Sequence, residues 1–264
     1  MLSASRAFRQ SSSSAPEFPR VPALRDVYDR LGWRPREGGI TMIAGIPGGG
    51  KSMFTTFWVA SMGIPALYFA ADTSPYDASM RLATMALREP VEEIEARLQG
   101  GEDDQVVAAL RGAKINFSFG APLTWQGIEE ELDAWVELRN DYPKIVVLDN
   151  LMDFGGGDSD YTAQMAIMSD VTAFARKTGI HVVVLHHATD KGFNDPRMPP
   201  PRSAIKNGLA EKPEQVLTVA GDPESKIFRV AKVKDRSGKP DPSGETYATL
   251  RAIPGIASFA PMES

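Results

Sequence analysis

The chain has 264 residues, of which 42% are hydrophobic and 24% charged, and its formal net charge is −5. The absence of cysteine excludes disulfides, thiolate metal sites and a cysteine nucleophile, and a total of three histidines makes a zinc site unexpected. No apolar run is long enough to span a bilayer, so we expect no membrane partner. The acidic total weighs against a nucleic-acid coat protein but allows a local basic channel.

The first 20 residues are polar and serine-rich, without the apolar core of a secretory signal. We expect residues 1–20 to form a flexible arm and not an organellar targeting sequence. Residues 21–264 are expected to form one domain, which begins with a short helix between residues 21 and 36. The expected location is the cytoplasm of a bacterium or of the host of a phage or plasmid.

The next stretch carries the pattern G-x-x-x-x-G-K-[ST] as GIPGGGKS, residues 45–52. Residues 40–44 before it predict a buried strand, and residues 53–60 after it predict a helix. In this context the backbone N–H groups of the loop bind phosphates, whereas the alternative is a plain glycine turn. We expect Lys51 to reach the outer phosphates of ATP and Ser52 to ligate Mg²⁺. The predicted nucleotide-binding positions are Gly45, Ile46, Pro47, Gly48, Gly49, Gly50, Lys51, Ser52 and Met53.

Strands and helices then alternate until the tail, where the pattern changes to successive strands. We expect strands at 66–71, 115–119, 144–148 and 181–185, helices at 75–89, 91–99, 126–140 and 162–177, and tail strands at 215–220, 226–233 and 245–253. This order predicts an α/β fold with a mostly parallel central sheet, helices on both faces and a C-terminal antiparallel extension.

Two aspartates end predicted strands. Asp149 follows the apolar run IVVL, and the carboxyl ends of parallel strands face the ligand crevice, so we expect it to hold Mg²⁺ beside Ser52. Asp72 ends the strand that begins at residue 66, where a carboxylate could orient and deprotonate the attacking water. The alternative for Asp72 is an N-cap of the helix that begins near Pro75.

His186 and His187 follow the apolar strand 181–185. Because side chains alternate along a strand, one of them should face the crevice and the other should point away. We expect the crevice-facing residue to contact the terminal phosphate. The alternative is a pair of surface histidines at a strand end.

These motifs, in this order, resemble the RecA-like ATPase core of DnaB-type and RepA-type hexameric replicative DNA helicases, over about residues 21–251. The segments that carry the resemblance are GITMIAGIPGGGKS, LYFAADTSPYDASMRL, IVVLDN, VVVLHHATDKG and KVKDRSGKPDPSG. The resemblance implies that Asp72 stands at the catalytic glutamate position, one methylene shorter, and that His187 stands at the sensor position. About 20 residues precede the first expected helix, so we expect the N-terminal domain of DnaB-type helicases to be absent. Either a separate primase or loader supplies its contacts, or the chain is a minimal motor.

The last of these segments resembles the family's K-x-R-x-G hairpin. It places Lys234 and Arg236 on the positions of the cations that enter the site of a neighbouring subunit. The resemblance thus implies a homo-hexamer with lysine and arginine fingers acting in trans. A hairpin with cations at its tip suits this role, because such a cation neutralises charge on the transferring phosphoryl group.

Two loops are candidates for contact with single-stranded DNA. Residues 153–160 are acidic and glycine-rich, whereas residues 188–212 hold five cations against three acids. The predicted DNA-binding residues of the second loop are Lys191, Arg197, Arg202 and Lys206. The alternative is an exposed loop with scattered charge.

These features predict an ATP-hydrolysing ring motor that translocates on single-stranded DNA, most simply a replicative DNA helicase. Two alternatives share the core. One is a recombination ATPase similar to RecA or RadA that forms filaments on single strands. The other is a regulatory ATPase similar to KaiC without a nucleic-acid partner, which the basic loop disfavours.

Overall fold

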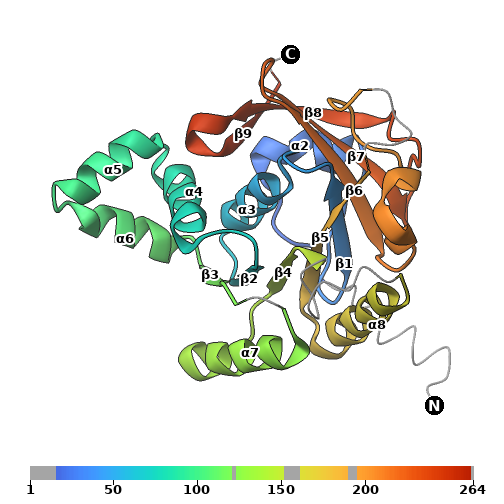
Figure 1. The fold of residues 1–264 in the computed structure, drawn as a ribbon, viewed down its shortest axis with the longest axis horizontal. Coiled ribbons are helices and arrows are strands. Elements are labelled where there is room, and N and C mark those ends of the chain that lie inside the picture. Colours follow the sequence, from blue (N-terminus) through green and yellow to red (C-terminus); the bar gives the residue numbers. More distant parts are fainter. Residues whose placement is uncertain (1–15, 121–122, 152–160, 190–194, 263–264) are drawn as a thin grey trace.

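The computed structural model describes residues 16–120, 123–151, 161–189 and 195–262. Within these residues a nine-stranded sheet has the strand order β3-β2-β4-β5-β1-β6-β7-β8-β9 (Figure 1). The strands are β1 (Ile40–Gly45), β2 (Ala66–Ala70), β3 (Ile115–Ser118), β4 (Ile145–Asp149), β5 (His181–His187), β6 (Gln215–Asp222), β7 (Ile227–Asp235), β8 (Tyr247–Ile253) and β9 (Ser258–Pro261). Pairing is parallel from β3 to β6 and antiparallel from β6 to β9, which confirms the predicted sheet.

Helices cover both faces of this sheet. They are α2 (Arg25–Asp29), α3 (Lys51–Met62), α4 (Pro75–Leu87), α5 (Val91–Gln99), α6 (Asp103–Gly112), α7 (Trp125–Arg139) and α8 (Tyr161–Thr178). Short 3-10 turns are η1 (Pro22–Leu24), η3 (Arg202–Ala204), η4 (Lys206–Glu211) and η5 (Pro254–Ile256). Figure 1 shows α7 and α8 on one side of the sheet and α2 and α3 on the other.

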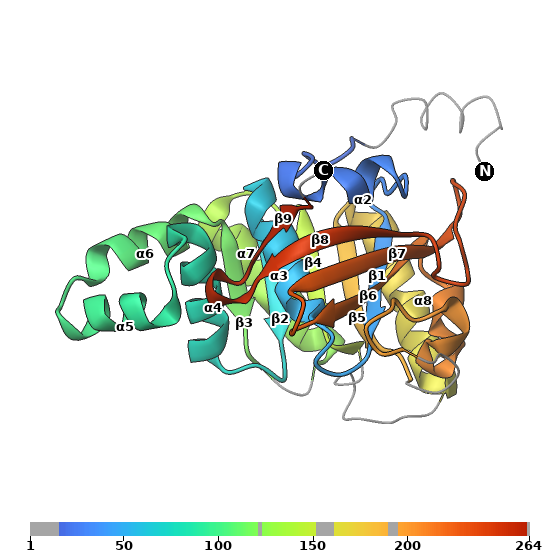
Figure 2. The ribbon, with the colours of Figure 1, turned by 90° about the horizontal axis from the view of Figure 1, so that it is seen from above.

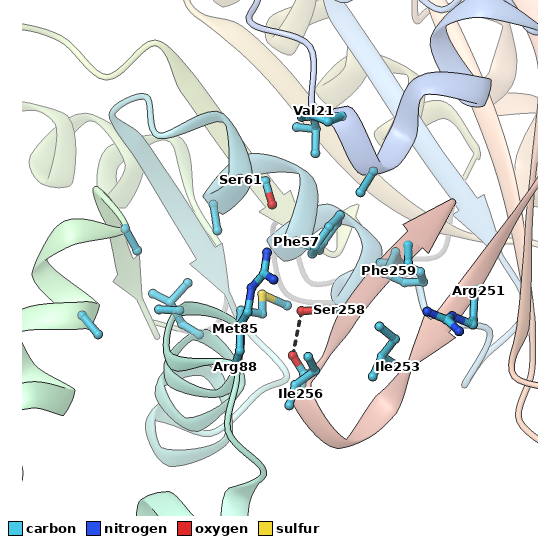
Figure 3. Close-up of a pocket in the computed structure, with 18 of the residues that line it drawn as sticks. Val21, Phe57, Ser61, Met85, Arg88, Arg251, Ile253, Ile256, Ser258 and Phe259 are labelled. Carbon is cyan, nitrogen blue, oxygen red and sulfur yellow. Dashed lines mark hydrogen bonds between the residues drawn. The ribbon is translucent and has the colours of Figure 1, made fainter. Parts of the chain in front are cut away.

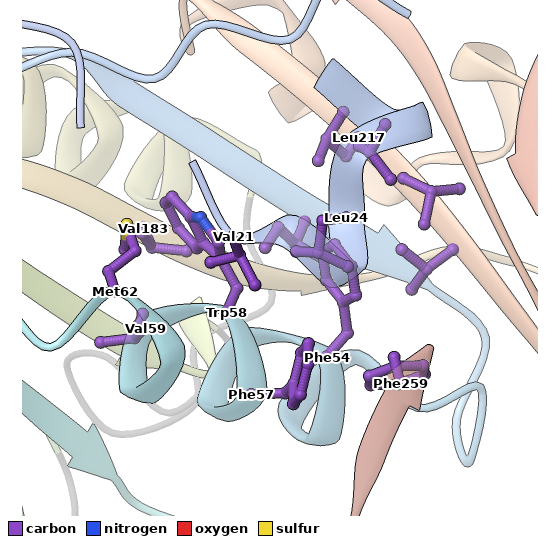
Figure 4. Packing of buried hydrophobic residues seen from close by; sticks show 14 of the residues in the cluster. Val21, Leu24, Phe54, Phe57, Trp58, Val59, Met62, Val183, Leu217 and Phe259 are labelled. Carbon is purple, nitrogen blue, oxygen red and sulfur yellow. The ribbon is translucent and has the colours of Figure 1, made fainter. Parts of the chain in front are cut away.

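Alternate residues of the central strands supply two separate cores. Ile43 packs with α3 and η1 on one face, whereas its neighbours Met42 and Ala44 pack with α7 and α8 on the other. Figure 4 shows the first core, where Trp58 and Phe54 of α3 lie against the sheet. Because β1 is buried on both faces, the loop after it starts from a fixed position.

Two elements were not predicted. The helix α6 was missed although Val106 and Leu110 have helical spacing and contact the same cluster. It packs with α4 and α5 as a satellite cluster that extends from one end of the sheet (Figure 2). The strand β9 was also missed; its sequence SFAP holds one large apolar residue and ends in proline, which is a weak strand signal. The helix expected between residues 21 and 36 is limited to η1 and α2.

The segment before η1 contacts the domain where the structure describes it. Glu17 forms an isolated antiparallel bridge with Arg36, and the Phe18 ring meets His181 edge-on at 5.4 Å between centroids. Residues 1–15 of the expected arm lie outside the described residues. In the described part of the chain, no helix has the length and apolar character to cross a membrane.

Candidate nucleotide site

The glycine loop connects β1 to α3 as predicted. Gly48 and Gly50 have φ values of 73° and 87°, in the left-handed region that favours glycine, and α3 begins at Lys51. A Cβ at Gly50 would lie 2.8 Å from Cε2 of Phe228 on β7. Glycine is therefore required at position 50 by conformation and by space, because the Phe228 ring of β7 packs directly against the loop.

Lys51 lies at the start of α3 and is 7% exposed. Its Nζ donates to the carbonyl oxygens of Gly45 at 3.2 Å and Ile46 at 3.1 Å. Burial lowers the pKa of Lys51, and the carboxylates of Asp149 and Asp72 act against this shift. The ammonium group is thus held over the loop, where it can reach the outer phosphates of a bound nucleotide.

The structure brings the two predicted Mg²⁺ ligands together. The Ser52 hydroxyl donates to the carboxylate of Asp149, which ends β4 and is 3% exposed. Burial raises the pKa of Asp149, while hydrogen bonds from Ser52 and Tyr68 lower it. A carboxylate and a hydroxyl beside a phosphate loop fit Mg²⁺, which takes oxygen ligands and substrate phosphates.

Tyr68 on β2 is a site residue that sequence reasoning missed. Its buried Oη donates to Oδ2 of Asp149 at 2.7 Å. Burial and the charge of Asp149 raise its pKa well above the usual value, so it remains a donor. The strand LYFAA reads as uniformly apolar, and only the alignment of β2 beside β4 reveals the contact.

Asp72 lies two residues past the end of β2 and is exposed. It does not cap α4, because the Ser74 side chain accepts from the backbone N–H of Asp77 at 3.0 Å. Its charge acts on the pKa values of both Lys51 and Asp149, so it lies within electrostatic range of the phosphate loop. The N-cap alternative is therefore wrong, whereas the general-base role stays a prediction.

The two histidines at the end of β5 have different surroundings, as alternation predicts. His186 is fully buried, and its Nε2 donates to the carbonyl oxygen of Lys206 at 3.1 Å. Burial lowers its pKa to about 4, so the ring is neutral at pH 7. His187 is partly exposed and lies opposite Gly45 in the β1–β5 register. The predicted sensor residue is therefore in register with the start of the phosphate loop.

The site geometry agrees with the comparison to known families. A family model described as an AAA domain matches residues 5–192. The chain belongs to the AAA domain family. Two curated relatives of this AAA domain are gene 65 proteins of phages. That of Mycobacterium phage L5 is 31% identical in an alignment of 251 residues, which covers 88% of this chain and 90% of the relative. That of Mycobacterium phage D29 is 30% identical in an alignment of 224 residues, which covers 81% of this chain and 95% of the relative.

Solved structures confirm the RecA-like fold of the AAA domain. A DnaB-like replicative helicase, solved in a study of its interactions with primase, matches with a TM-score of 0.78 at 18% identity, over 97% of this chain and 67% of its own. A separately solved ATPase domain matches with a TM-score of 0.74 at 17% identity, over 97% of this chain and 96% of that domain. The RadB recombinase matches with a TM-score of 0.58 at 13% identity, over 90% and 97%. The family and the fold support ATP binding, with Mg²⁺, and ATPase activity.

The predicted finger residues lie far from the AAA domain's own phosphate loop. Phe228 contacts Gly50, and Lys234 follows it by six strand residues, or about 20 Å. The Lys234 Nζ donates to the Glu211 carbonyl oxygen, and Arg236 Nη2 donates to that of Lys212 at 2.9 Å. Neither side chain can span the distance back to its own loop.

Lys232, two residues before Lys234, has a different role. It is 3% exposed, and its Nζ pairs with Asp235 at 2.7 Å and donates to the Gly32 carbonyl oxygen at 3.2 Å. Gly238 completes this corner, because a Cβ there would lie 2.6 Å from Oδ2 of Asp235. The hairpin is thus anchored by one buried ion pair while Lys234 and Arg236 remain near its surface.

The three predicted DNA-binding residues that the structure describes have different neighbours. Lys191 lies outside the described residues. Arg197 is paired with Asp195, with an Nε to Oδ1 distance of 2.9 Å. Arg202 lowers the pKa of Lys234 by its charge, whereas Lys206 acts in the same way on Lys51. The AAA domain therefore directs the three described cations toward three different neighbours.

A separate cavity of about 870 Å³ lies between η1, α3, α4, α6 and β9 (Figure 3). Phe57, Met85 and Phe259 give it apolar walls, and Arg88 and Arg251 lie at its sides. No residue from 45 to 52 lines it. This cavity is therefore distinct from the nucleotide site of the AAA domain.

Proposed function

We propose that this chain is an ATP-driven motor that translocates on single-stranded DNA as a homo-hexameric ring, acting as a replicative DNA helicase. The observation that carries the proposal is the position of Lys234 and Arg236 at the opposite end of β7 from the phosphate loop. Cations that cannot reach their own nucleotide site are suited to complete the site of a neighbouring subunit.

The proposed mechanism assigns each residue near the phosphate loop a step. Lys51 would bind the outer phosphates, and Ser52 and Asp149 would hold Mg²⁺, which would offset the charge of the phosphates. Asp72 orients the attacking water and accepts its proton. His187, in register with Gly45, contacts the terminal phosphate and transmits its loss to the segment after β5.

Proposed contacts with DNA come from that segment, through Arg202, Arg197 and Lys191. A basic loop binds single strands mainly through phosphates and releases counterions on binding. The gene 65 relatives are phage proteins, so we place the motor in the cytoplasm of a bacterial host. A separate primase or loader is a further proposed partner. The analogy is with the DnaB-like helicase, whose structure was solved in a study of its interactions with primase.

The decisive experiment mixes two inactive variants. Arg236→Ala removes the finger, and Asp72→Asn removes the base from the other side of the interface. If the finger acts in trans, some interfaces in the mixture pair an intact Asp72 with an intact Arg236 and recover part of the ATPase activity. Recovery should rise with protein concentration, since association completes the site. No recovery at any ratio, with subunit exchange verified, would remove the support for trans fingers.

Imaging of the ATP-bound assembly tests the remaining alternatives. A closed ring supports the helicase, and an open filament on single strands supports a recombinase, whose fold the RadB structure represents here. ATPase activity without any affinity for single-stranded DNA would favour a regulatory ATPase.

A further inference from the structure

The segment after β5 returns to the nucleotide site. Pairing between β4 and β5 ends at Leu148 opposite Val184, so β5 continues beyond its neighbour. In this position Ala188 forms an antiparallel bridge with Ile205, and Thr189 N–H donates to the Ala204 carbonyl oxygen at 2.8 Å. Residues 204–206 thus run beside the end of β5, where β4 no longer pairs.

This pairing places Lys206 in line with the phosphate loop. Counting back one residue from the Ala188–Ile205 bridge, Lys206 stands opposite His187, which stands opposite Gly45. Neighbouring strands are about 4.8 Å apart, so the backbones of Lys206 and Gly45 are about 10 Å apart. A lysine side chain extends on the order of 6 Å. Lys206 can therefore reach a phosphoryl group that lies between it and the loop.

The backbone of Lys206 is fixed while its side chain is exposed. His186, fully buried and neutral, donates from Nε2 to the Lys206 carbonyl oxygen at 3.1 Å. The next residue, Asn207, donates from Nδ2 to Oε1 of Gln164 on α8 at 2.8 Å. The backbone is therefore positioned before a ligand binds, and only the lysine side chain has to be ordered on binding.

Lys206 adds positive charge to a site in which Asp149 and Asp72 supply negative charge. It lowers the pKa values of both Lys51 and His186. Among the ion pairs of the described residues, none includes Lys206. Two lysines that repel each other across a crevice attract an anion placed between them, because each then gains an opposite charge.

We propose that Lys206 is a second lysine of the nucleotide site, which contacts the terminal phosphate of a nucleoside triphosphate in its own subunit. This assignment replaces the sequence-based expectation that Lys206 binds DNA, and it rests on the proposed nucleotide site. A group that contacts only the terminal phosphate distinguishes a triphosphate from a diphosphate. Its position directly after β5 also connects phosphate occupancy to the segment proposed to contact DNA.

The test compares Lys206→Gln with Lys177→Gln, the same loss of an exposed lysine near the C-terminal end of α8. Binding of a non-hydrolysable ATP analogue, of ADP and of a fluorescent single-stranded oligonucleotide is measured with Mg²⁺. Lys206→Gln should weaken analogue binding about tenfold or more, the equivalent of one charge-assisted hydrogen bond. ADP affinity should stay within about twofold, and Lys206→Arg should restore most of the loss. Lys177→Gln should leave both nucleotide affinities unchanged.

An unchanged ratio of analogue to ADP affinity in Lys206→Gln would overturn the proposal. A loss confined to oligonucleotide binding would return Lys206 to the DNA-binding residues and also overturn it. Failure of the wild-type chain to bind either nucleotide would refute the nucleotide site as a whole. If instead the wild type binds both nucleotides and Lys206→Gln keeps the wild-type ratio of affinities, only the role of Lys206 is refuted and the nucleotide site stands.

Discussion

Replacing Gly50 by alanine tests whether the Phe228 ring of β7 leaves no room for a side chain in the phosphate loop. The residue has φ 87° and its Cβ would lie 2.8 Å from a ring carbon of Phe228. The left-handed conformation costs about 1–2 kcal/mol for a residue with a Cβ. Overpacking against the ring adds about 1–3 kcal/mol. We therefore expect Gly50→Ala to lower the free energy of unfolding by about 2–5 kcal/mol.

The same helix provides the control. Gly63 at the C-terminal end of α3 has φ 62°, and nothing lies within 4 Å of its would-be Cβ. Gly63→Ala should therefore carry only the conformational cost of about 1–2 kcal/mol. In a protein of this size each kcal/mol shifts the melting temperature by about 2–4 °C. Gly50→Ala should then melt about 2–12 °C below Gly63→Ala.

Thermal unfolding of four variants measures both the conformational cost of the positive φ and the overpacking cost against Phe228. The set is Gly50→Ala, Gly63→Ala, Phe228→Leu and the double variant Gly50→Ala with Phe228→Leu. If the aromatic ring of Phe228 is the obstacle, Phe228→Leu should reduce the cost of Gly50→Ala by about 1–3 kcal/mol. This difference is the coupling energy of the double-mutant cycle. Equal melting temperatures for the two alanine variants, together with no coupling to Phe228, would refute the reasoning. ATP-analogue binding should also be lost in Gly50→Ala and kept in Gly63→Ala.

Three further outcomes are expected. Tyr68→Phe removes the donor to Asp149, so the Mg²⁺ concentration for half-maximal analogue binding should rise about tenfold or more; an unchanged Mg²⁺ titration would show that the hydroxyl does not orient the ligand. The pKa of Lys234 is lowered to about 8, chiefly by burial, so finger-dependent ATPase activity should fall as the pH rises through about 8. Lys234→Arg stays charged and should keep its activity at higher pH, and pH–rate profiles that coincide would contradict this. Asp72→Asn should slow hydrolysis about a hundredfold or more without loss of stability. Ser74→Ala should lower the free energy of unfolding by about 1 kcal/mol and leave turnover intact. Melting and ATPase assays that give the reverse pattern would make Asp72 the helix cap and Ser74 the catalytic residue.

The sequence predicted most of the sheet because its signals are local. The parallel strands are short apolar runs between long amphipathic helices, and the glycine loop has a specific residue pattern. The helix α6 was not predicted, although Val106 and Leu110 are spaced as on one face of a helix. Its position depends on packing against α4 and α5, which is a tertiary effect.

The residues of the site could be predicted where a motif names them, as for Lys51, Ser52 and Asp149. Tyr68 could not, because its role arises from the alignment of β2 with β4 and not from its neighbours in sequence. Lys206 was assigned by net charge to the DNA loop. The return of the chain to the end of β5 was not visible in the sequence, because tertiary contacts fix it. These are the Ala188–Ile205 bridge and the hydrogen bonds of Thr189 and His186 to the returning backbone.

The strand β7 joins two chemically different ends. Phe228 near its beginning touches the phosphate loop, and Arg236 follows directly after its last residue. In the proposed ring, each copy of β7 would be a stiff spacer between the nucleotide of its own subunit and the nucleotide of the next. Inserting one residue would lengthen the spacer by about 3.3 Å and reverse the direction of every side chain beyond the insertion. The length of β7 would then be constrained by the distance between neighbouring nucleotides around the ring, in addition to the packing of a single subunit.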